Sequence, residues 1–291
     1  MNSLTVGVLN LNEASLTIDV LDKVALLPKA GWDTQLIVVD NGSADDEVQC
    51  LADWFLVNRS PFAEALLIAA SRNLGCAGGR NVILKLAAGE AFLFLDNDVI
   101  LPDNPEWLTI LWQDLQADPN VAIVGPMLVF SDYPAIVQAA GIGLTSRGRV
   151  GYLHRGDPVE MVPAMSVQVG ISPSACWLLR PEAQRTIGLF AEEFDPAQYE
   201  DVDFCVRLGL GGWKIICNCS VKIAHIENVT TRNIPEHPFA RLTVRNAIQF
   251  REKWASVLPQ IATIREEEIY WGPIPRPAEG DNGREIGQGT S

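Results

Sequence analysis

The chain has 291 residues, of which 48% are hydrophobic and 20% are charged. This composition is typical of a soluble globular protein and excludes a wholly disordered chain. No apolar run reaches the roughly 18 residues that a membrane-spanning helix needs, and the N-terminal residues lack the basic region of a secretory signal. We therefore expect a cytoplasmic protein that makes at most peripheral contact with a membrane.

The formal net charge is −14, from 22 basic and 36 acidic side chains. A surface this acidic repels the phosphate backbone of nucleic acids unless a local basic patch overrides the repulsion. The modest basic cluster between Arg232 and Arg251 lies on a predicted helix and is diluted by Glu236. Nucleic acid is therefore not an expected partner.

Apolar, strand-like segments alternate with helix-like segments over about the first 100 residues, which is typical of a parallel sheet with crossover helices. This pattern predicts an α/β fold with a Rossmann-like, mostly parallel central sheet and flanking helices. The predicted strands span residues 5–10, 36–39, 66–70 and 91–95, and the predicted helices span residues 16–27, 44–55 and 82–88. A glycine-rich stretch over residues 73–81 leads into the last helix, and Gly89 stands where a helix end favours a left-handed residue.

The pattern beyond Val99 is mixed, so we expect a second half in which strands and helices no longer alternate regularly. Helices are predicted over residues 105–115, 201–210 and 238–254, and Pro181 suits the first position of another helix. Strands are predicted over residues 121–124, 174–179, 213–216 and 221–224, and a loop or hairpin over residues 141–152. Residues 272–291 have many Pro and Gly and little apolar content, which predicts a disordered tail.

Asp96-Asn97-Asp98 follows the predicted strand at residues 91–95. Ligands of open α/β sheets bind at the carboxyl ends of the strands. Two carboxylates at that edge can share a divalent cation, since Mg²⁺ and Mn²⁺ prefer oxygen ligands and bridge to substrate phosphates. The alternative is a solvated turn, because Asp and Asn are common in turns. The position after a buried strand favours the metal site.

Two further polar clusters follow predicted strands. Asp40 directly follows the strand at residues 36–39 and can accept hydrogen bonds from a ribose or a base, whereas Asn41 and Ser43 serve equally well as helix caps. In residues 73–81 the glycines allow the backbone to approach a ligand, and Arg80 can pair with a diphosphate. Their spacing differs from the dinucleotide-binding fingerprint, which argues against a nicotinamide or flavin enzyme.

Tyr199-Glu200-Asp201-Val202-Asp203 opens a predicted helix. Acids at a helix start complement the helix dipole, but three acids within four positions exceed what capping needs. On a helix start that faces a cleft, one of them can take a proton from an incoming hydroxyl. His225 ends the apolar run at residues 221–224 and is either a metal ligand or a structural histidine.

Together these motifs resemble glycosyltransferase family 2 in order and spacing over residues 4–230. The matching segments are Asn10-Leu11-Asn12 with Glu13, Asp40 to Ser43, Asn73 to Asn81, Leu95 to Asp98, Ser174 to Trp177, Glu200 to Asp203, and His225. Several motifs in one order are far more specific than any single motif. The resemblance implies a GT-A fold and transfer of a sugar, with inversion, from a nucleotide diphosphate-sugar to a hydroxyl of a glycan or lipid-linked saccharide in polysaccharide biosynthesis.

The resemblance also implies roles for individual residues. Asp201 is implied as the general base, with Glu200 orienting it or binding the acceptor. The implied ligands of Mg²⁺ or Mn²⁺ are Asp96, Asp98 and His225. The implied donor-binding residues are Asn10, Asn12, Glu13, Asp40, Asn41, Asn73, Gly75, Arg80, Asn81, Asp96 and Asn97. Trp177 is either an apolar platform for the acceptor sugar or part of the core.

The resemblance implies a GT-A domain over residues 1–230, with a nucleotide-sugar half at residues 1–125 and an acceptor half at residues 126–230. A helical extension is expected over residues 231–271. Two other functions are considered. A nucleotidyltransferase acting on sugar phosphates needs a loop rich in lysine and glycine near the N-terminus, which residues 10–15 lack. An inactive carbohydrate- or nucleotide-binding module would have lost the carboxylates, all of which are present.

Overall fold

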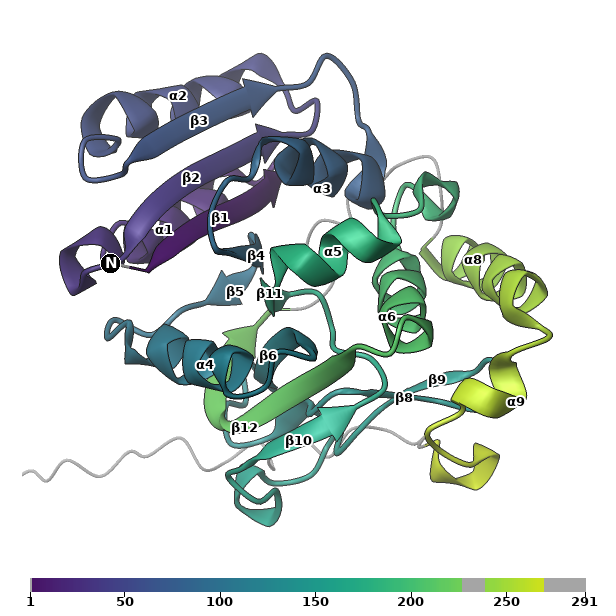
Figure 1. Ribbon diagram of the computed structural model, residues 1–291. Helices are drawn as coiled ribbons and strands as arrows, with labels where there is room; N and C mark the ends of the chain where they lie inside the picture. Colours follow the sequence, from purple (N-terminus) through teal and green to yellow (C-terminus); the bar gives the residue numbers. More distant parts are fainter. Residues whose placement is uncertain (1, 227–238, 270–291) are drawn as a thin grey trace, which may run out of the picture.

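The structure is a computed structural model that describes residues 2–226 and 239–269 (Figure 1). Within these ranges, ten strands form one mixed sheet, and β8 and β9 form a separate hairpin. The strands are β1 (Ser3–Asn10), β2 (Asp33–Asp40), β3 (Glu64–Ala69), β4 (Ala91–Asp96), β5 (Val99–Ile100), β6 (Val121–Phe130), β7 (Val137–Ala139), β8 (Ile142–Leu144), β9 (Val150–Tyr152), β10 (Ser166–Val169), β11 (Cys176–Leu179) and β12 (Lys214–His225). The α-helices are α1 (Ala14–Val24), α2 (Asp45–Asn58), α3 (Gly75–Leu86), α4 (Glu106–Ala117), α5 (Pro181–Ile187), α6 (Glu200–Leu210), α8 (Phe239–Trp254) and α9 (Leu258–Ile261).

The large sheet has two halves that meet at β11. On one side, β4, β1, β2 and β3 lie next to one another and run parallel. On the other side, β6 and β12 are parallel, while β10 runs antiparallel along β12. β11 is antiparallel to both β4 and β6 and joins the two halves. The predicted α/β fold, with a mostly parallel half followed by a mixed half, is confirmed.

β2 is buried on both faces, as an apolar run in a parallel sheet predicts. Leu36 and Val38 pack on the face that α1, α2 and α4 cover, and Ile37 and Val39 pack on the face of α3, α5 and α6. The alternation of side chains along a strand produces these two apolar layers. Because the sheet is covered on both faces, a ligand has access to the parallel half only at its edges.

The register of the parallel strands brings the predicted polar motifs to one edge. Asn10 at the end of β1 pairs with Asp40 at the end of β2. On the other side of β1, Leu9 pairs with Asp96 at the end of β4. The three motifs that follow these strands therefore share the carboxyl edge of the sheet, where α/β folds bind their ligands.

The glycine-rich stretch is already helical, because α3 begins at Gly75 rather than at the predicted start near Val82. A Cβ on Gly79 would lie 2.4 Å from Cδ1 of Leu9 in β1. Gly75 has a φ of +80°, and a Cβ there would lie 2.2 Å from the carboxyl group of Asp195. These two glycines therefore let α3 pack closely against the protein's own chain, and a close approach of their backbone to a ligand stays a prediction.

Gly89 does not have the left-handed conformation that we expected. Glycine is needed here because the backbone of β1 leaves no space for a side chain. A Cβ at this position would lie 2.5 Å from the backbone N of Thr5 and 2.7 Å from the carbonyl C of Leu4. Oγ1 of Thr5 accepts hydrogen bonds from the N–H groups of Ala88 and Gly89 at 3.1 and 2.9 Å. The turn between α3 and β4 is thereby fixed against β1.

The two strands predicted over residues 213–216 and 221–224 are one continuous strand, β12. Its pairing with β6 shifts register between Asn218 and Lys222. Oδ1 of Asn218 accepts hydrogen bonds from Ser220 N–H and Oγ at 3.0 and 2.5 Å and from Val221 N–H at 3.3 Å. The Asn218 side chain thus binds the backbone N–H groups of the irregular segment, and the strand continues beyond it. The polar residues at this point of the sequence therefore mark a bulge rather than the end of a strand.

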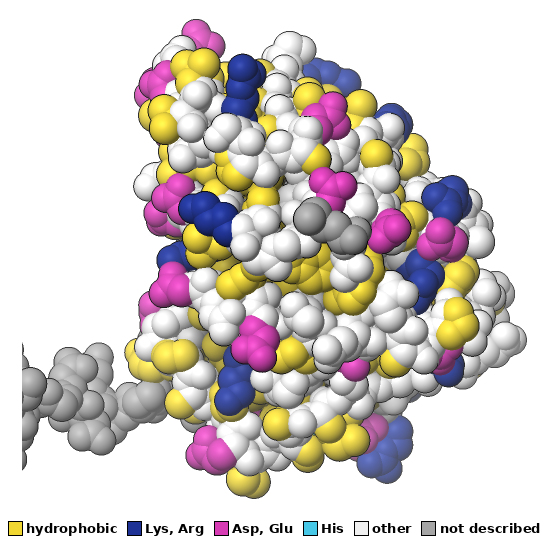
Figure 2. All heavy atoms as spheres, turned by 60° about the vertical axis from the view of Figure 1, so that its left-hand side comes forward, with side chains coloured by type: hydrophobic (Ala, Val, Ile, Leu, Met, Phe, Trp, Pro, Cys, Tyr) yellow, Lys and Arg dark blue, Asp and Glu magenta, His cyan; other side chains and the backbone are white. Residues whose placement is uncertain are grey.

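The predicted C-terminal helix is present as α8. It buries Leu242, Ala247 and Phe250, and the last two belong to the core cluster that also contains Phe194 and Tyr199. The predicted tail at residues 272–291 lies outside the described residues. Within the described ranges, no helix combines the length and apolarity that crossing a membrane requires. Figure 2 shows one face of the surface, on which acidic and basic side chains are scattered around a central area of hydrophobic side chains.

The contacts of Gly89 lead to a stability prediction. Gly89→Ala should lower the free energy of unfolding by about 1–3 kcal/mol, because its methyl group meets backbone that cannot rotate away. Gly209→Ala is the matched control, since no atom lies within 4 Å of a Cβ at this position in α6, and it should raise the free energy of unfolding by up to about 1 kcal/mol. Urea denaturation measures both; equal effects would contradict the close approach at Gly89.

Candidate active site

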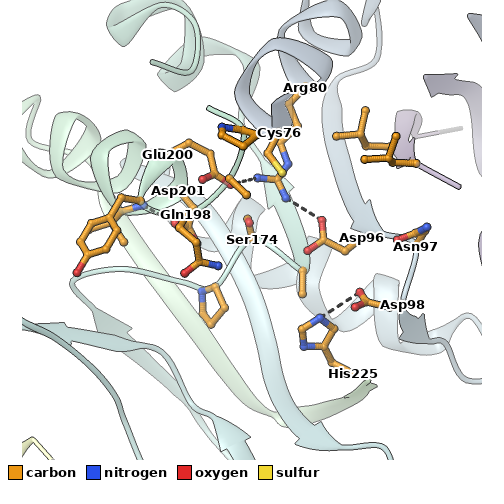
Figure 3. Close-up of a pocket in the computed structure, with 18 of the residues that line it drawn as sticks. Cys76, Arg80, Asp96, Asn97, Asp98, Ser174, Gln198, Glu200, Asp201 and His225 are labelled. Carbon is orange, nitrogen blue, oxygen red and sulfur yellow. Dashed lines mark hydrogen bonds and ion pairs between the residues drawn. The ribbon is translucent and has the colours of Figure 1, made fainter. Parts of the chain in front are cut away.

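A pocket opens at the carboxyl ends of β1 and β4, facing the start of α6 (Figure 3). It collects ten of the sixteen residues that the sequence motifs suggested. These ten are Asn10, Asn41, Asn73, Arg80, Asp96, Asn97, Asp98, Glu200, Asp201 and His225. They come from both halves of the sheet, so the pocket exists only where the halves meet.

Asp96, Asp98 and His225 form a cluster in which one ligand atom of each lies within 4.8 Å of the others. β4 ends at Asp96, and the short strand β5 that follows pairs with the end of β12, so that His225 lies opposite Val99. The N–H of Ile226 also donates to the backbone carbonyl of Asp98 at 3.0 Å. Two carboxylates and one imidazole are ligands that suit Mn²⁺ and, for the oxygens, Mg²⁺. The donor set therefore fits the divalent cation that the motifs predicted.

Arg80 connects this cluster to the start of α6 through two ion pairs. Its Nη2 lies 2.7 Å from Oδ1 of Asp96, and its Nη1 lies 2.8 Å from Oε1 of Glu200. Burial acts to lower the pKa of Arg80, but the two carboxylates outweigh it and raise the pKa, so the guanidinium stays charged. Arg80 reaches the pocket as predicted, although both of these nitrogens already serve the protein's own carboxylates; its contact with a diphosphate stays a prediction.

The three acids at the start of α6 lie in different surroundings. Asp201 lines the pocket, with Oδ1 accepting from the N–H of Val202 at 2.8 Å. Asp203 is fully buried on another side of the helix, because residues two apart on a helix point in different directions. Its carboxylate binds three side chains at 2.8, 2.7 and 3.0 Å, which are Arg207, Lys253 and Trp254. Of these two aspartates, only Asp201 faces the pocket.

The surroundings of Glu200 and Asp201 raise the pKa of both carboxyl groups. Burial raises the pKa of Glu200 to about 7, and the charge of Asp201 acts in the same direction while Arg80 opposes it. Burial also raises the pKa of Asp201, against the lowering effect of Arg80 and of the N–H groups of Val202 and Ser174. A carboxylate with a raised pKa binds a proton more strongly, which suits a general base.

The backbone just before these acids is strained. Gln198 and Tyr199 have φ angles of +79° and +74°, which non-glycine residues adopt at a cost of about 1–3 kcal/mol each. The buried side chain of Asn246 in α8 holds this segment: its Nδ2 donates to the carbonyls of Phe194, Ala197 and Gln198 at 2.6, 2.9 and 2.8 Å. Helix α8 therefore helps to fix the position of the acids at the start of α6.

Asp40 is placed differently from our expectation, since it lies inside β2, is 0% exposed and does not line the pocket. Its carboxylate accepts hydrogen bonds from Asn10 Nδ2 at 2.8 Å, Ser43 Oγ at 2.6 Å and the N–H groups of Gly42 and Ser43 at 3.2 and 2.9 Å. Asp40 thus organises the turn after β2, and its removal would disturb the fold. Donor recognition by Asp40 stays a prediction.

Trp177 is not a platform at the pocket surface. It is 0% exposed, its Nε1 donates to the carbonyl of Ser172 at 3.1 Å, and its ring packs on Phe190 and Phe204. β11 is covered on both faces, so its side chains join the core rather than the cleft. Of the two interpretations that the sequence allowed for Trp177, core packing is correct.

The remaining predicted donor residues also lie outside the pocket lining. Asn81 is buried and exchanges hydrogen bonds with the backbone of Phe190. Asn12 accepts from the N–H of Ala44 at 3.0 Å. Glu13 precedes the first residue of α1, and Gly75 makes room for Asp195. Their geometry supports structural roles, and direct donor contacts stay predictions.

The pocket contains residues that the sequence reasoning missed, among them Gln138, Tyr152 and Gln198. None belongs to a motif with a recognisable spacing. The one available signal was Gln138, an amide within the otherwise apolar residues 136–140. A polar side chain in a buried strand needs a hydrogen-bond partner, and that partner is not visible in the sequence.

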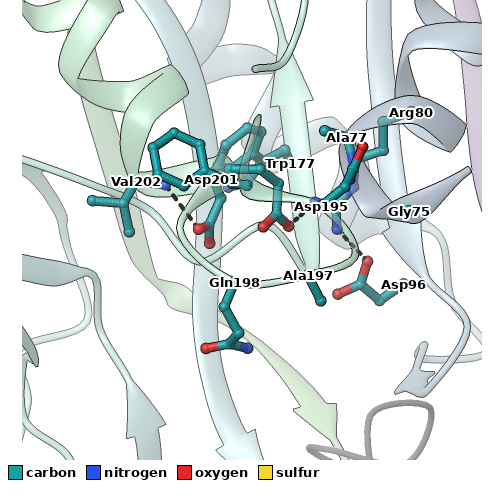
Figure 4. Close-up of polar contacts among 12 residues, drawn as sticks. Gly75, Ala77, Arg80, Asp96, Trp177, Asp195, Ala197, Gln198, Asp201 and Val202 are labelled. Atoms are coloured by element: carbon teal, nitrogen blue, oxygen red, sulfur yellow. Dashed lines mark hydrogen bonds and ion pairs between the residues drawn. The ribbon is translucent and has the colours of Figure 1, made fainter. Parts of the chain in front are cut away.

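Asp195 provides a test of pH dependence. Its Oδ1 accepts from the N–H of Ala77 at 2.9 Å at the start of α3 (Figure 4). Burial raises the pKa of Asp195 from 3.8 to about 6, although the N–H groups of Ala77 and Gly78 oppose the rise. In the folded state, the carboxyl therefore keeps its proton to a higher pH than in the unfolded state.

Ionisation of the Asp195 carboxyl therefore costs more free energy in the folded state than in the unfolded state. The stabilising effect of the protonated carboxyl is lost as the pH rises from 3.8 to about 6. Asp195→Asn keeps an acceptor oxygen but does not titrate. The variant should therefore gain in free energy of unfolding relative to the wild-type protein across this pH range. Urea denaturation of both proteins at several pH values measures the gain, and a difference that does not vary with pH would contradict it.

Comparisons with known proteins identify the family and the fold of this chain. Residues 5–183 match the sequence model of the family described as glycosyl transferase family 2. The chain is 31% identical over 169 residues to the O-antigen biosynthesis protein RfbC of Myxococcus xanthus. That match covers 54% of this chain but only 12% of RfbC. The chain thus corresponds to a small part of this curated relative.

Solved structures show the same fold. The mannosyltransferase PcManGT from Pyrobaculum calidifontis, in complex with GDP-Man and Mn²⁺, matches with a TM-score of 0.58 and 19% identity over 88% of this chain and 64% of PcManGT. GalNAc-T7 with UDP, GalNAc and Mn²⁺ matches with a TM-score of 0.67 and 12% identity over 89% of this chain and 50% of GalNAc-T7. These likenesses show the GT-A fold. With a family match that spans more than half of its length, the chain belongs to glycosyl transferase family 2.

Proposed function

We propose that this protein transfers a sugar from a nucleotide diphosphate-sugar to an acceptor hydroxyl, with inversion at the anomeric carbon and with Mn²⁺ or Mg²⁺ as cofactor. One observation carries the proposal: the cluster of Asp96, Asp98 and His225 shares a pocket with the half-buried carboxylate of Asp201. A cation site and a base on opposite sides of one pocket are what a single displacement of a diphosphate requires.

The donor would lie at the carboxyl edge of the parallel strands. Asn10, Asn41 and Asn73 line this side of the pocket and offer amide groups for hydrogen bonds to the nucleotide. Asp96, Asp98 and His225 would hold the cation, which would supply positive charge for the departing diphosphate. Arg80 adds a fixed positive charge behind Asp96.

The acceptor would enter from the side of α6. Asp201 would take the proton from the acceptor hydroxyl as its oxygen attacks the sugar, and Glu200, held by Arg80, would keep the start of α6 in place. Tyr152 lines this side of the pocket and is 44% exposed, in contrast to the buried Trp177. We therefore propose Tyr152 as the aromatic contact of the acceptor.

The substrate class is supported by what similar proteins bind. The two solved structures contain GDP-Man or UDP with GalNAc, each together with Mn²⁺. The curated relative is named for O-antigen biosynthesis. We propose a glycan or lipid-linked saccharide as the acceptor, polysaccharide biosynthesis as the process and the cytoplasm as the location.

Donor binding should depend on the cation. In thermal unfolding, UDP or GDP at 100 times its Kd should stabilise the protein by about 2.7 kcal/mol in the presence of Mn²⁺ and far less in excess chelator. Asp98→Asn should lose the Mn²⁺-dependent part of this stabilisation. Asp103→Asn is the control, because Asp103 is an exposed partner of Lys23 outside the pocket. Equal stabilisation with and without Mn²⁺, or full transfer in chelator, would refute the metal requirement.

Transfer should depend on Asp201. Asp201→Asn keeps the shape of the side chain but cannot take a proton, so transfer should fall by about 10²–10⁴-fold while nucleotide affinity is retained. Asp203→Asn is the control; it should reduce stability, since Asp203 holds three side chains, but retain transfer per folded molecule. The measurement is sugar transfer and nucleotide affinity for both variants. Near-normal transfer by Asp201→Asn would exclude it as the base.

A further inference from the structure

Gln138 contacts His225 at two points. Its Oε1 lies 2.8 Å from Nδ1 of the imidazole ring, and its Nε2 lies 3.2 Å from the backbone carbonyl oxygen of the same residue. Gln138 is 2% exposed, and 87 residues separate it from His225 in the chain. Both ends of the side-chain amide therefore contact one residue of the proposed metal cluster.

These two contacts determine which ring nitrogen carries the proton. A backbone carbonyl only accepts hydrogen bonds, so the NH₂ end of the Gln138 amide must face it. The oxygen end then faces Nδ1, and because an amide oxygen only accepts, Nδ1 of His225 must carry a proton. In the neutral ring the lone pair is then on Nε2, which lies 3.1 Å from Oδ1 of Asp98.

The backbone around Gln138 holds this arrangement. β7 pairs with β6 through Leu128 opposite Ala139 and Val129 opposite Val137, so Gln138 is the extra residue of a bulge. A bulge turns a side chain away from the regular alternation and is common beside active sites. The carbonyl of Gln138 also accepts from Nη1 of Arg155 at 3.3 Å. The backbone of β7 therefore fixes the orientation of the Gln138 amide.

We propose that Gln138 is a positioning residue that holds His225 in the Nδ1–H tautomer, with Nε2 directed at Asp98 as the nitrogen ligand of the cation. The proposal rests on the metal site of the proposed function. Without the amide oxygen, the neutral ring is free to move its proton to Nε2 or to rotate, and either change must be reversed before the cation binds. Such outer contacts change metal affinity by about 10- to 100-fold.

The first test is Mn²⁺ binding by calorimetry, without donor or acceptor. Gln138→Leu removes the amide at similar size and should weaken Mn²⁺ binding by about 10- to 100-fold. Gln138→Glu retains an oxygen that accepts from Nδ1 and should bind Mn²⁺ more tightly than Gln138→Leu. Gln184→Leu is the matched control, because Gln184 lies on α5, donates to the carbonyl of Gly188 and does not line the pocket. This variant should bind Mn²⁺ like the wild-type protein.

The second test is ¹⁵N NMR of the histidine rings in metal-free Asp98→Ala protein, at a pH at which the rings are neutral; this variant lacks the carboxylate, 3.1 Å from Nε2, that would otherwise accept from an Nε2–H. The chain has three histidines, and loss of one signal in His225→Asn assigns His225. Asp98→Ala should show the Nδ1–H tautomer, and adding Gln138→Leu to it should shift the ring toward Nε2–H or a mixture. Thermal unfolding checks that each variant is folded, and Gln138→Met, which also lacks the amide, replaces Gln138→Leu if that variant does not fold.

The outcomes separate the two proposals. Mn²⁺ binding by Gln138→Leu within twofold of the wild-type value, or an Nε2–H tautomer in Asp98→Ala, overturns the role of Gln138 and leaves the metal site standing. A wild-type protein that binds no Mn²⁺ refutes the metal site, and the role of Gln138 fails with it. Weaker Mn²⁺ binding together with a changed tautomer supports the role of Gln138.

Discussion

A buried guanidinium joins the two halves of this protein. Arg80 is 5% exposed and pairs with Asp96 of the metal cluster and with Glu200 at the start of α6. Charges buried to this extent are tolerated only when they are paired and hydrogen-bonded. The distance between the proposed cation and the proposed base thus depends on one side chain of α3, and any movement of α6 away from the sheet would leave a charge unpaired.

Close packing around α3 keeps Arg80 in place. Glycine at positions 75 and 79 lets the helix lie against Asp195 and Leu9, and Asp195 in turn accepts from the helix start. The segment after Asp195 is held by Asn246 and leads directly into the acids of α6. A helix near the end of the chain therefore stabilises a strained backbone that positions groups in the pocket.

The motifs combine residues that contact the pocket with residues that hold the loops around it. Asp40 and Asn81 are typical polar motif residues, yet both are buried and bind the protein's own backbone. Asn41 does both, since it lines the pocket and donates to Asn73 at 3.0 Å. A polar residue after a strand has donors and acceptors in either role, so the sequence pattern alone does not separate the two.

The sequence by itself determined the alternation of strands and helices over about the first 100 residues and the location of the acids at strand and helix ends, because these follow from local periodicity and turn chemistry. The family followed from the resemblance of several motifs in order and spacing. Only the tertiary structure decided which side chains meet. His225 reaches Asp98 through the pairing of β5 with β12, and Gln138 reaches His225 through a bulge in β7. Trp177 is in the core because β11 is covered on both faces. Contacts between residues far apart in the chain depend on strand register and helix packing, and neither is encoded in a short segment of sequence.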